Sequence, residues 1–302
     1  MTSIDRLTQA ARIQRNKQDG MQTNADAHPA KSPPIKTQGI KTKLVPFIRR
    51  NISWSGRGRW MEPFLGSGTV LFNIEPRRAL VSDTNKHIIL FYKQIQDGTI
   101  NSDTVRTFLE AEGNALLRDG QNHYYRVRDR FNETHDPLDF LFLNRSCFNG
   151  LMRFNGKGRF NTPFCRKPQR FSAAYVTKIC NQVDWASRTM AAKDWEFVCA
   201  DWRATLSETK EDDFLYADPP YAGRFTDYYN GWHDNDAAML EDRLKTLPCP
   251  YLYSMWAENQ YRRNDGLFRT FSDKTIKIHE HFYHLGSTES LRNTMKEALV
   301  IG

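Results

Sequence analysis

The sequence predicts an α/β fold in which helices flank a largely parallel β-sheet. Two observations lead to this prediction. Short apolar segments alternate with amphipathic helical segments on both sides of the middle of the chain, and Gly66-Ser67-Gly68 links one predicted strand to a helix start. A strand, a glycine turn, a helix and a second strand form a βαβ unit. Between residues 97 and 193 this alternation stops, which indicates an inserted, mostly helical module.

Hydrophobic periodicity predicts the individual elements, including the seven strands of a mixed sheet. Strands are expected from Trp60 onward and over Ala79–Asp83, Glu196–Ala200, Asp213–Ala217, Pro250–Met255, Ile276–Tyr283 and Lys296–Ile301. Helices are expected over Thr42–Ile52, after Gly68, and over His87–Gln94, Thr104–Leu117, His123–Phe131 and Asp236–Leu247. Asn144–Arg170 is predicted to be a long ordered loop, and Arg6–Lys17 a short helix. We therefore divide the chain into a flexible polar arm (1–32), a core domain (33–96 and 194–302) and an insertion (97–193).

Composition excludes several classes of protein. The five cysteines are scattered without a C-x-x-C pair, which argues against a disulfide framework or a zinc site and favours a reducing compartment. No apolar run approaches the roughly 20 residues that span a bilayer. The N-terminus has no apolar core of a secretory signal. We expect a cytoplasmic protein with no membrane partner and no metal, a monomer in solution.

Positive charge is concentrated in one segment. The chain carries a net charge of +8 and has a pI of about 9.2. Residues 140 to 183 contain eight Lys or Arg and no Asp or Glu, although the whole chain has 35 acidic residues. A solvated basic face would explain a shorter run. A segment of this length is typical of a surface that faces a nucleic-acid backbone.

Asp218-Pro219-Pro220-Tyr221 follows the apolar strand Phe214-Leu215-Tyr216-Ala217 and indicates a binding site. Proline cannot continue a central strand, because it lacks the backbone donor. The turn therefore exposes the Asp218 carboxylate and the Asp218–Pro219 carbonyl beside the Tyr221 ring. Two acceptors and a ring suit a planar nitrogen heterocycle that bears an amino group. A simple turn at the end of a strand is the alternative.

The first βαβ unit indicates a nucleoside ligand. Gly66 and Gly68 allow close approach of a ligand, and the acidic Asp83 follows Glu62 by about 20 residues, the offset at which an acid holds a ribose in nucleotide-binding folds. Leu71 stands where the third glycine of a dinucleotide site would be, which disfavours NAD and an NAD-linked oxidoreductase. Glu62 is a poor neighbour for phosphate but suits a sulfonium or amine. S-adenosylmethionine fits these features; a plain turn at the glycines and a helix cap at Asp83 are the alternatives.

Several motifs in a fixed order carry a family resemblance. They are Lys36-Thr37-Gln38-Gly39-Ile40-Lys41, Glu62-Pro63-Phe64-Leu65-Gly66-Ser67-Gly68, Ser82-Asp83-Thr84-Asn85, Asn144-Arg145-Ser146-Cys147-Phe148-Asn149-Gly150-Leu151-Met152-Arg153, Gly158-Arg159-Phe160-Asn161-Thr162-Pro163-Phe164 and Asp218–Tyr221. With them, residues 33 to 302 resemble the Dam-type, D12 class adenine-N6 DNA methyltransferases, and within that family the EcoRV modification branch. Thr37 and Ile40 depart from the Dam pattern in the manner of that branch.

The resemblance implies a Rossmann-like fold dependent on S-adenosylmethionine, with residues 97–193 as the target-recognition domain. The implied catalytic residues are Asp218, Pro219, Pro220 and Tyr221. The implied cofactor-binding residues are Thr37, Gln38, Gly39, Lys41, Glu62, Pro63, Phe64, Gly66, Gly68, Asp83, Thr84, Asp201, Trp202 and Asp218. The implied DNA-binding residues are Lys36, Arg145, Phe148, Asn149, Leu151, Arg153, Asn155 and Pro163. An internal salt bridge or a phosphate contact explains Arg145 equally well, and core packing is the alternative for Phe148 and Leu151.

The implied function is transfer of a methyl group to N6 of adenine in double-stranded DNA (EC 2.1.1.72), within a GAT-containing site such as GATATC or GATC. A restriction endonuclease acting separately is an implied partner. A structured-RNA base methyltransferase and a catalytically idle DNA-binding homologue are the alternatives. Cytosine-N4 transfer ranks below them, because related enzymes of that kind usually have Ser in place of Asp218.

Overall fold

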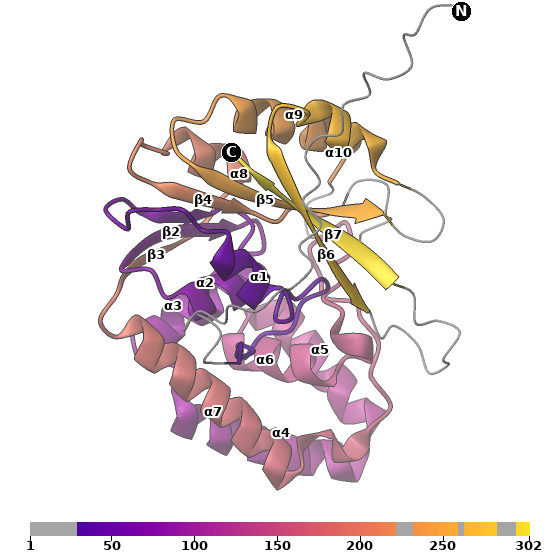
Figure 1. Cartoon of the computed structure of the whole chain (residues 1–302). Coiled ribbons are helices and arrows are strands. Elements are labelled where there is room, and N and C mark those ends of the chain that lie inside the picture. The colour runs from indigo at the N-terminus through magenta and orange to yellow at the C-terminus, as the bar shows by residue number, and fades with distance from the viewer. Residues whose placement is uncertain (1–28, 222–231, 259–262, 283–293) are drawn as a thin grey trace, which may run out of the picture.

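The computed structural model describes residues 29–221, 232–258, 263–282 and 294–302 (Figure 1). Most of the predicted arm, with the Arg6–Lys17 helix, lies outside the described residues. The last residues of the arm are held by the body of the protein. The backbone N–H of Lys31 donates to Asn73 Oδ1 at 2.9 Å, and Gln182 Nε2 donates to the carbonyl of Ser32 at 2.9 Å.

Seven strands form a single mixed sheet in the order β3-β2-β1-β4-β5-β7-β6, which confirms the predicted fold class. The strands are β1 (Trp60–Glu62), β2 (Arg78–Asp83), β3 (Asp194–Cys199), β4 (Phe214–Ala217), β5 (Tyr251–Glu258), β6 (Thr275–Phe282) and β7 (Thr294–Ile301). Strands β3, β2, β1, β4 and β5 run parallel, whereas β7 is antiparallel to both β5 and β6. The chain reverses its winding direction between β1 and β4, and crevices that bind ligands open at such a point, beyond the carboxyl ends of the strands.

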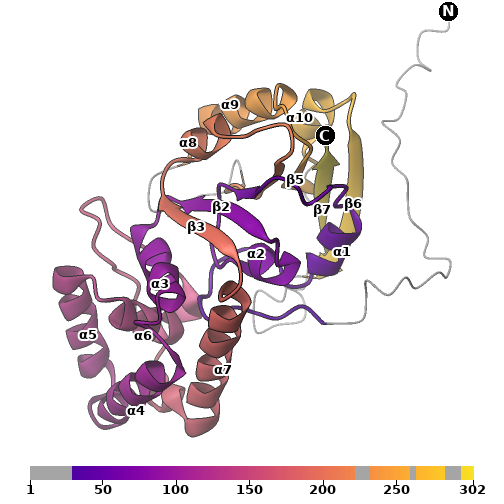
Figure 2. The ribbon, with the colours of Figure 1, turned by 90° about the vertical axis from the view of Figure 1, so that its left-hand side faces the viewer.

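Helices cover both faces of the sheet. They are α1 (Val45–Arg50), α2 (Thr69–Ile74), α3 (Lys86–Gln96), α4 (Ser102–Asp119), α5 (Gln121–Thr134), α6 (Pro137–Ser146), α7 (Ala173–Met190), α8 (Trp202–Ser207), α9 (Asp234–Lys245) and α10 (Asp265–Thr270). Figure 2 shows α8, α9 and α10 on one face of the sheet and α2, α3 and α7 on the other. The alternation of buried side chains in the strands produces this arrangement. Trp60 packs into the hydrophobic cluster on one face of the sheet, and the next residue, Met61, packs into the cluster on the opposite face.

The helices predicted within the described residues are present, and four further helices found there, α6, α7, α8 and α10, were not predicted. Helices α4 to α7 lie within residues 97–193 and pack against one another below the sheet (Figure 1). They share one continuous hydrophobic cluster with the sheet: Val127 of α5 and Val183 of α7 belong to the same cluster as Trp60 and Val81. The division into a core domain and an insertion therefore stays a prediction.

The long loop predicted over Asn144–Arg170 begins after α6 and contains only short 3-10 turns, at Phe148–Gly150 and Pro168–Phe171. Buried Thr162 holds it in shape. The Thr162 hydroxyl donates to the carbonyl of Leu151 at 2.9 Å and accepts from the backbone N–H of Arg153 at 3.1 Å. Tyr124 of α5 donates to the Thr162 carbonyl at 2.8 Å. These bonds fix the two loop residues that approach the site described below.

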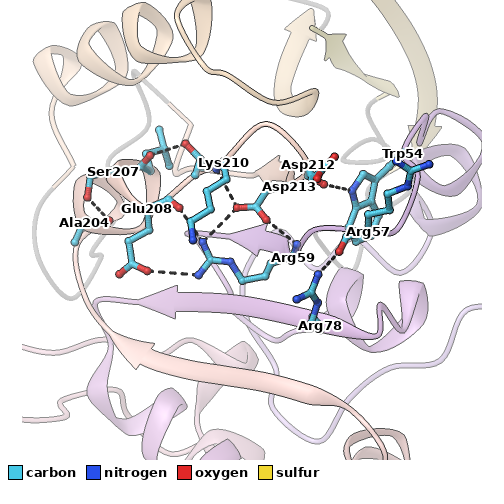
Figure 3. Close-up of polar contacts among 12 residues, drawn as sticks. Trp54, Arg57, Arg59, Arg78, Ala204, Ser207, Glu208, Lys210, Asp212 and Asp213 are labelled. Atoms are coloured by element: carbon cyan, nitrogen blue, oxygen red, sulfur yellow. Dashed lines mark hydrogen bonds and ion pairs between the residues drawn. The ribbon is translucent and has the colours of Figure 1, made fainter.

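The amino ends of β1 and β4, at the edge of the sheet opposite that site, are joined by the carboxylate of Asp213 (Figure 3). Asp213 accepts from the backbone N–H groups of Arg59 at 2.7 Å and Lys210 at 3.0 Å, and forms an ion pair with the Arg59 guanidinium at 3.2 Å. The carboxylate is buried, so its loss would leave the backbone N–H groups of Arg59 and Lys210 without this acceptor and would break the ion pair with the Arg59 guanidinium.

We expect Asp213→Ala to lower the free energy of unfolding by about 3 kcal/mol, because breaking a buried, hydrogen-bonded ion pair costs about this much. Urea unfolding monitored by circular dichroism measures the change. Glu208→Ala is the matched control, since Glu208 pairs with the same Arg59 but is 60% exposed and should cost less than about 1 kcal/mol. Equal effects of the two substitutions would contradict this account of the strand ends.

Candidate active site

A cavity of about 250 Å³ opens at the carboxyl ends of β1, β2 and β4. Of the predicted cofactor-binding residues, Thr37, Gln38, Gly39, Lys41, Glu62, Pro63, Phe64, Gly66, Asp83, Thr84, Asp201, Trp202 and Asp218 line it. Of the other predicted site residues, Pro220, Leu151 and Arg153 also line it. The structure therefore gathers segments that lie far apart in the sequence at the position where the fold places a ligand crevice.

The glycine turn between β1 and α2 is built around Asp83. Gly66 has φ of 51°, and its backbone N–H donates to one Asp83 oxygen at 2.9 Å; the other oxygen accepts from the N–H of Asn85 at 2.8 Å. Burial raises the pKa of Asp83, although these two N–H groups oppose the rise. Gly68 does not line the cavity. It has φ of 73° at the start of α2, and a Cβ there would lie 2.9 Å from the Phe72 ring, so Gly68 is required by packing.

Lys41 is a buried residue of the cavity lining, and three oxygen atoms surround its ammonium group. Its Nζ is 3.1 Å from Asp218 Oδ1 and 3.5 Å from Glu297 Oε2, and donates to the Tyr221 hydroxyl at 2.8 Å. The ammonium also lies 4.9 Å from the centre of the Tyr221 ring. Lys41 is 4% exposed and Glu297 is fully buried. The Asp-Pro-Pro-Tyr turn is therefore fixed by the segment before α1 and by β7, both remote from it in sequence.

Burial changes the acid–base properties of this corner. It raises the pKa of Asp218 to about 6; Lys41 opposes the rise and Glu297 adds to it. Burial alone would lower the pKa of Lys41, but Asp218 and Tyr221 outweigh it and raise that pKa well above its usual value. Burial also raises the pKa of Glu62 to about 8, although Trp60 Nε1 donates to its carboxylate at 2.8 Å. At neutral pH Lys41 is therefore charged and Glu62 mostly neutral.

The other end of the cavity is formed by the turn from β3 into α8. Asp201 caps α8 by accepting from the N–H of Arg203 at 2.9 Å, and it also accepts from the Arg203 guanidinium at 3.0 and 3.1 Å. The same guanidinium lies 4.4 Å from the centre of the Trp202 ring and donates to Asp236 of α9 at 2.6 Å. Asp236 and Trp232, which line the cavity here, were not predicted.

The predicted DNA-binding residues fall into two groups. Phe148, Asn149, Arg153, Asn155 and Pro163 are exposed or partly exposed on the loop after α6, with Phe148 50% exposed and Arg153 at the rim of the cavity. Leu151, at the same rim, is partly buried. An exposed phenylalanine beside a cavity is not explained by core packing.

Arg145 and Lys36 lie in a second group, around Tyr175 of α7. Arg145 is only 2% exposed and donates to the Tyr175 hydroxyl at 3.4 Å and to Gln182. Lys36 and Arg170 donate to the same hydroxyl, at 3.2 and 2.9 Å. The side chain of Arg145 is thus internal, and Lys36 and Arg170, both partly buried, are the cations of this cluster that retain exposed area. A contact of Arg145 with DNA stays a prediction.

Comparison with known proteins identifies the family. A family model described as D12 class N6 adenine-specific DNA methyltransferase matches residues 38–288. The chain belongs to this family. Similar proteins include a type II methyltransferase, M.MjaIII, of Methanocaldococcus jannaschii (29% identical, covering 71% of this chain and 80% of the relative). A DNA adenine methylase of Vibrio cholerae is 31% identical over 69% of this chain and 74% of its own length. That of Serratia marcescens is 30% identical with the same coverage.

The protein is therefore an adenine-specific DNA methyltransferase, which acts on N6 of adenine in DNA and requires a methyl donor. The family resemblance expected from the motifs is confirmed, whereas a special closeness to the EcoRV branch stays a prediction. In the described part of the chain, no helix is long and apolar enough to cross a membrane, and no group of His, Cys, Asp and Glu side chains could hold a metal.

Proposed function

We propose that this cavity binds S-adenosylmethionine next to an extruded adenine, and that Asp218 and the Asp218–Pro219 carbonyl accept hydrogen bonds from the N6 amine during methyl transfer (the activity of EC 2.1.1.72). The observation that carries the proposal is the position of Asp218, at the meeting point of the cofactor cavity and the loop that bears Phe148. Bound S-adenosylmethionine supplies an electrophilic methyl group on a sulfonium sulfur.

The chemistry of the cavity fits this cofactor. The carboxyl groups of Asp83 and Asp218 line it together with the mostly neutral Glu62, whereas Lys41, the lysine that the described part of the lining contains, is already engaged by Asp218. Such a wall favours a cation and disfavours a pyrophosphate, and the Trp202 ring offers a surface for the adenine of the cofactor. Beside the adenine of the cofactor, Asp201 would hold this end of the cavity through its hydrogen bonds to Arg203. Gly66 and Thr37 would face the methionine part of the cofactor.

The residues around N6 have distinct roles in the proposed reaction. The amine is a weak nucleophile because its lone pair is conjugated with the ring. Acceptance of its N–H bonds by Asp218 and by the adjacent carbonyl localises that lone pair and stabilises the positive charge that develops on nitrogen. The Tyr221 ring would stack on the base, and Lys41 holds that ring through its hydroxyl.

DNA would lie across the basic loop. Extrusion of the base costs a few kcal/mol, and an exposed aromatic wedge such as Phe148 offsets the cost by filling the stack. Arg153 would read a guanine next to the target through its O6 and N7 atoms, near Lys36. Lys36 and Arg170 would meet backbone phosphates beside Tyr175. The pairing of Arg153 with Lys36 is consistent with a GAT-containing site, GATATC or GATC. Expression of the protein in a strain with no adenine methylation of its own, followed by sequencing of the methylated bases, would define the site.

Activity should depend on the charge of Asp218. Only the ionised carboxylate is a strong acceptor, so we expect kcat/KM to fall about tenfold per pH unit below a midpoint near pH 6. Ionisation of Asp218 has the opposite effect on the stability of the fold: it favours activity but lowers stability. Because folding raises this pKa from 3.8 to about 6, the contribution of Asp218 to stability is complete below pH 3.8 and is lost as the pH rises through 6. Initial rates of methyl transfer from pH 5 to 8 test the predicted fall of kcat/KM in acid, and a flat pH profile would contradict it.

Titration calorimetry with S-adenosylmethionine and with NAD tests the cofactor assignment. We expect binding of the former and none of the latter, and the reverse would overturn the proposal. A protein that binds both cofactor and DNA but transfers no methyl group would be the idle homologue. We further propose that the protein is a monomer in solution and acts on DNA in the cytoplasm, with any cognate restriction endonuclease acting separately.

A further inference from the structure

The proposed reaction uses one carboxylate, yet Lys41 lies between two. The second, Glu297, is on β7, where its register partners are Trp256 of β5 and His279 of β6. It is fully buried, and burying a carboxylate costs several kcal/mol unless a partner compensates. It forms an ion pair with the Lys41 ammonium at 3.5 Å. Glu297 does not line the cavity wall, so it would act through Lys41 and not on the base.

The geometry indicates what Glu297 does for Lys41. Three oxygens surround the ammonium: the Tyr221 hydroxyl accepts a hydrogen bond at 2.8 Å, and the carboxylates of Asp218 and Glu297 form ion pairs with it at 3.1 and 3.5 Å. Without Glu297, Asp218 would be the one carboxylate of this set that pairs with the ammonium. A lysine paired only with Asp218 would compete directly with the target amine for that carboxylate.

We propose that Glu297 is a positioning residue: it shares the charge of Lys41, so that the Asp218 carboxylate remains available to accept from the target amine while Lys41 still fixes the Tyr221 hydroxyl. This inference rests on the proposed role of Asp218. It assigns a catalytic consequence to a strand none of whose described side chains lines the cavity, and it explains why β7 carries a charged residue at a fully buried position.

The titratable groups around this corner determine the sign of the expected pH effect. Burial raises the pKa of Asp218, Lys41 opposes this and Glu297 adds to it. Tyr216, Glu62 and Tyr253 interact with Asp218 from β4, β1 and β5, and His279 faces Glu297 from β6. Removing only the charge of Glu297 therefore leaves Lys41 less opposed, and the pKa of Asp218 should fall.

Glu297→Gln tests the proposal, because glutamine keeps the shape and removes the charge. We expect kcat to fall about tenfold, KM for DNA and the dissociation constant for S-adenosylmethionine to stay within about twofold, and the acid limb of the kcat/KM profile to move to lower pH. Glu280→Gln is the matched control: Glu280 lies on the neighbouring strand, is 63% exposed and pairs with Lys296, and its change should leave all four quantities unaltered.

A Glu297→Gln enzyme with unchanged kcat and an unshifted acid limb would overturn the inference. A purely structural role would lower the folded fraction without moving the acid limb. If the glutamine variant does not fold, Glu297→Asp, which keeps the charge on a shorter side chain, is measured instead. This variant should have a reduced kcat but the acid limb of the wild-type kcat/KM profile. An acid limb moved to lower pH would refute the proposal. Failure of the wild type to methylate DNA would instead refute the proposed function.

Discussion

Replacing Asp218 by asparagine should reduce methyl transfer at least 100-fold while cofactor and DNA binding largely persist. The amide removes the negative charge that stabilises the developing charge on N6, and loss of one such electrostatic contact typically costs 10² to 10³ in kcat. The variant should still fold, because Lys41 keeps Glu297 and Tyr221 as partners. Single-turnover rates with saturating S-adenosylmethionine measure the loss, and calorimetry and fluorescence anisotropy measure the two binding steps.

Asp242→Asn is the matched control for this experiment. Asp242 is on α9, is 76% exposed, and forms a surface ion pair with Lys245. It undergoes the same change of charge and should keep wild-type turnover. Near-normal turnover of Asp218→Asn would remove this residue from the mechanism, and loss of cofactor binding in the same variant would assign it a binding role instead.

Replacing Arg153 by alanine should relax sequence discrimination by roughly 1–3 kcal/mol, which corresponds to about a 5- to 150-fold change. A guanidinium matches the O6 and N7 atoms of guanine with two hydrogen bonds, and Thr162 fixes the backbone of Arg153 at the rim of the cavity. The measured quantity is the ratio of kcat/KM for the methylated site to that for a duplex in which the adjacent G·C pair is replaced by A·T.

Arg159→Ala provides the control, since Arg159 is an exposed cation of the same loop. Loss of a phosphate contact weakens binding to all duplexes alike and reduces the salt dependence of binding, but leaves the ratio unchanged. An unchanged ratio in Arg153→Ala would show that another residue reads the guanine.

The strands were predictable because short buried runs have few alternative explanations. The unpredicted helices differ in how visible they are in the sequence. Helix α7 carries Val176, Ile179, Cys180 and Val183 at the i, i+3, i+4 and i+7 spacing of an amphipathic helix, so the sequence does contain its signal. Helices α8 and α10 are each six residues long, too short for periodicity to be visible.

The site was predictable where one motif contains its own chemistry, as in Asp218–Tyr221. Glu297 was not predicted, because its importance comes from the hairpin register that places it beside Lys41. The one available signal was a charged residue at a core-facing position of an apolar strand. Arg145 shows the converse case: a motif residue can be internal, and only the fold determines which side of a helix its guanidinium occupies.

The most direct test of the central claim is the identity of the methylated base. Duplex DNA and structured RNA are incubated with the protein and S-adenosylmethionine carrying a labelled methyl group, then hydrolysed to nucleosides and separated. We predict label in the DNA arm alone, as N6-methyldeoxyadenosine. Label in a cytosine derivative, or in RNA but not in DNA, would contradict the claim that Asp218 and its neighbouring carbonyl hold the amine of an adenine extruded from duplex DNA.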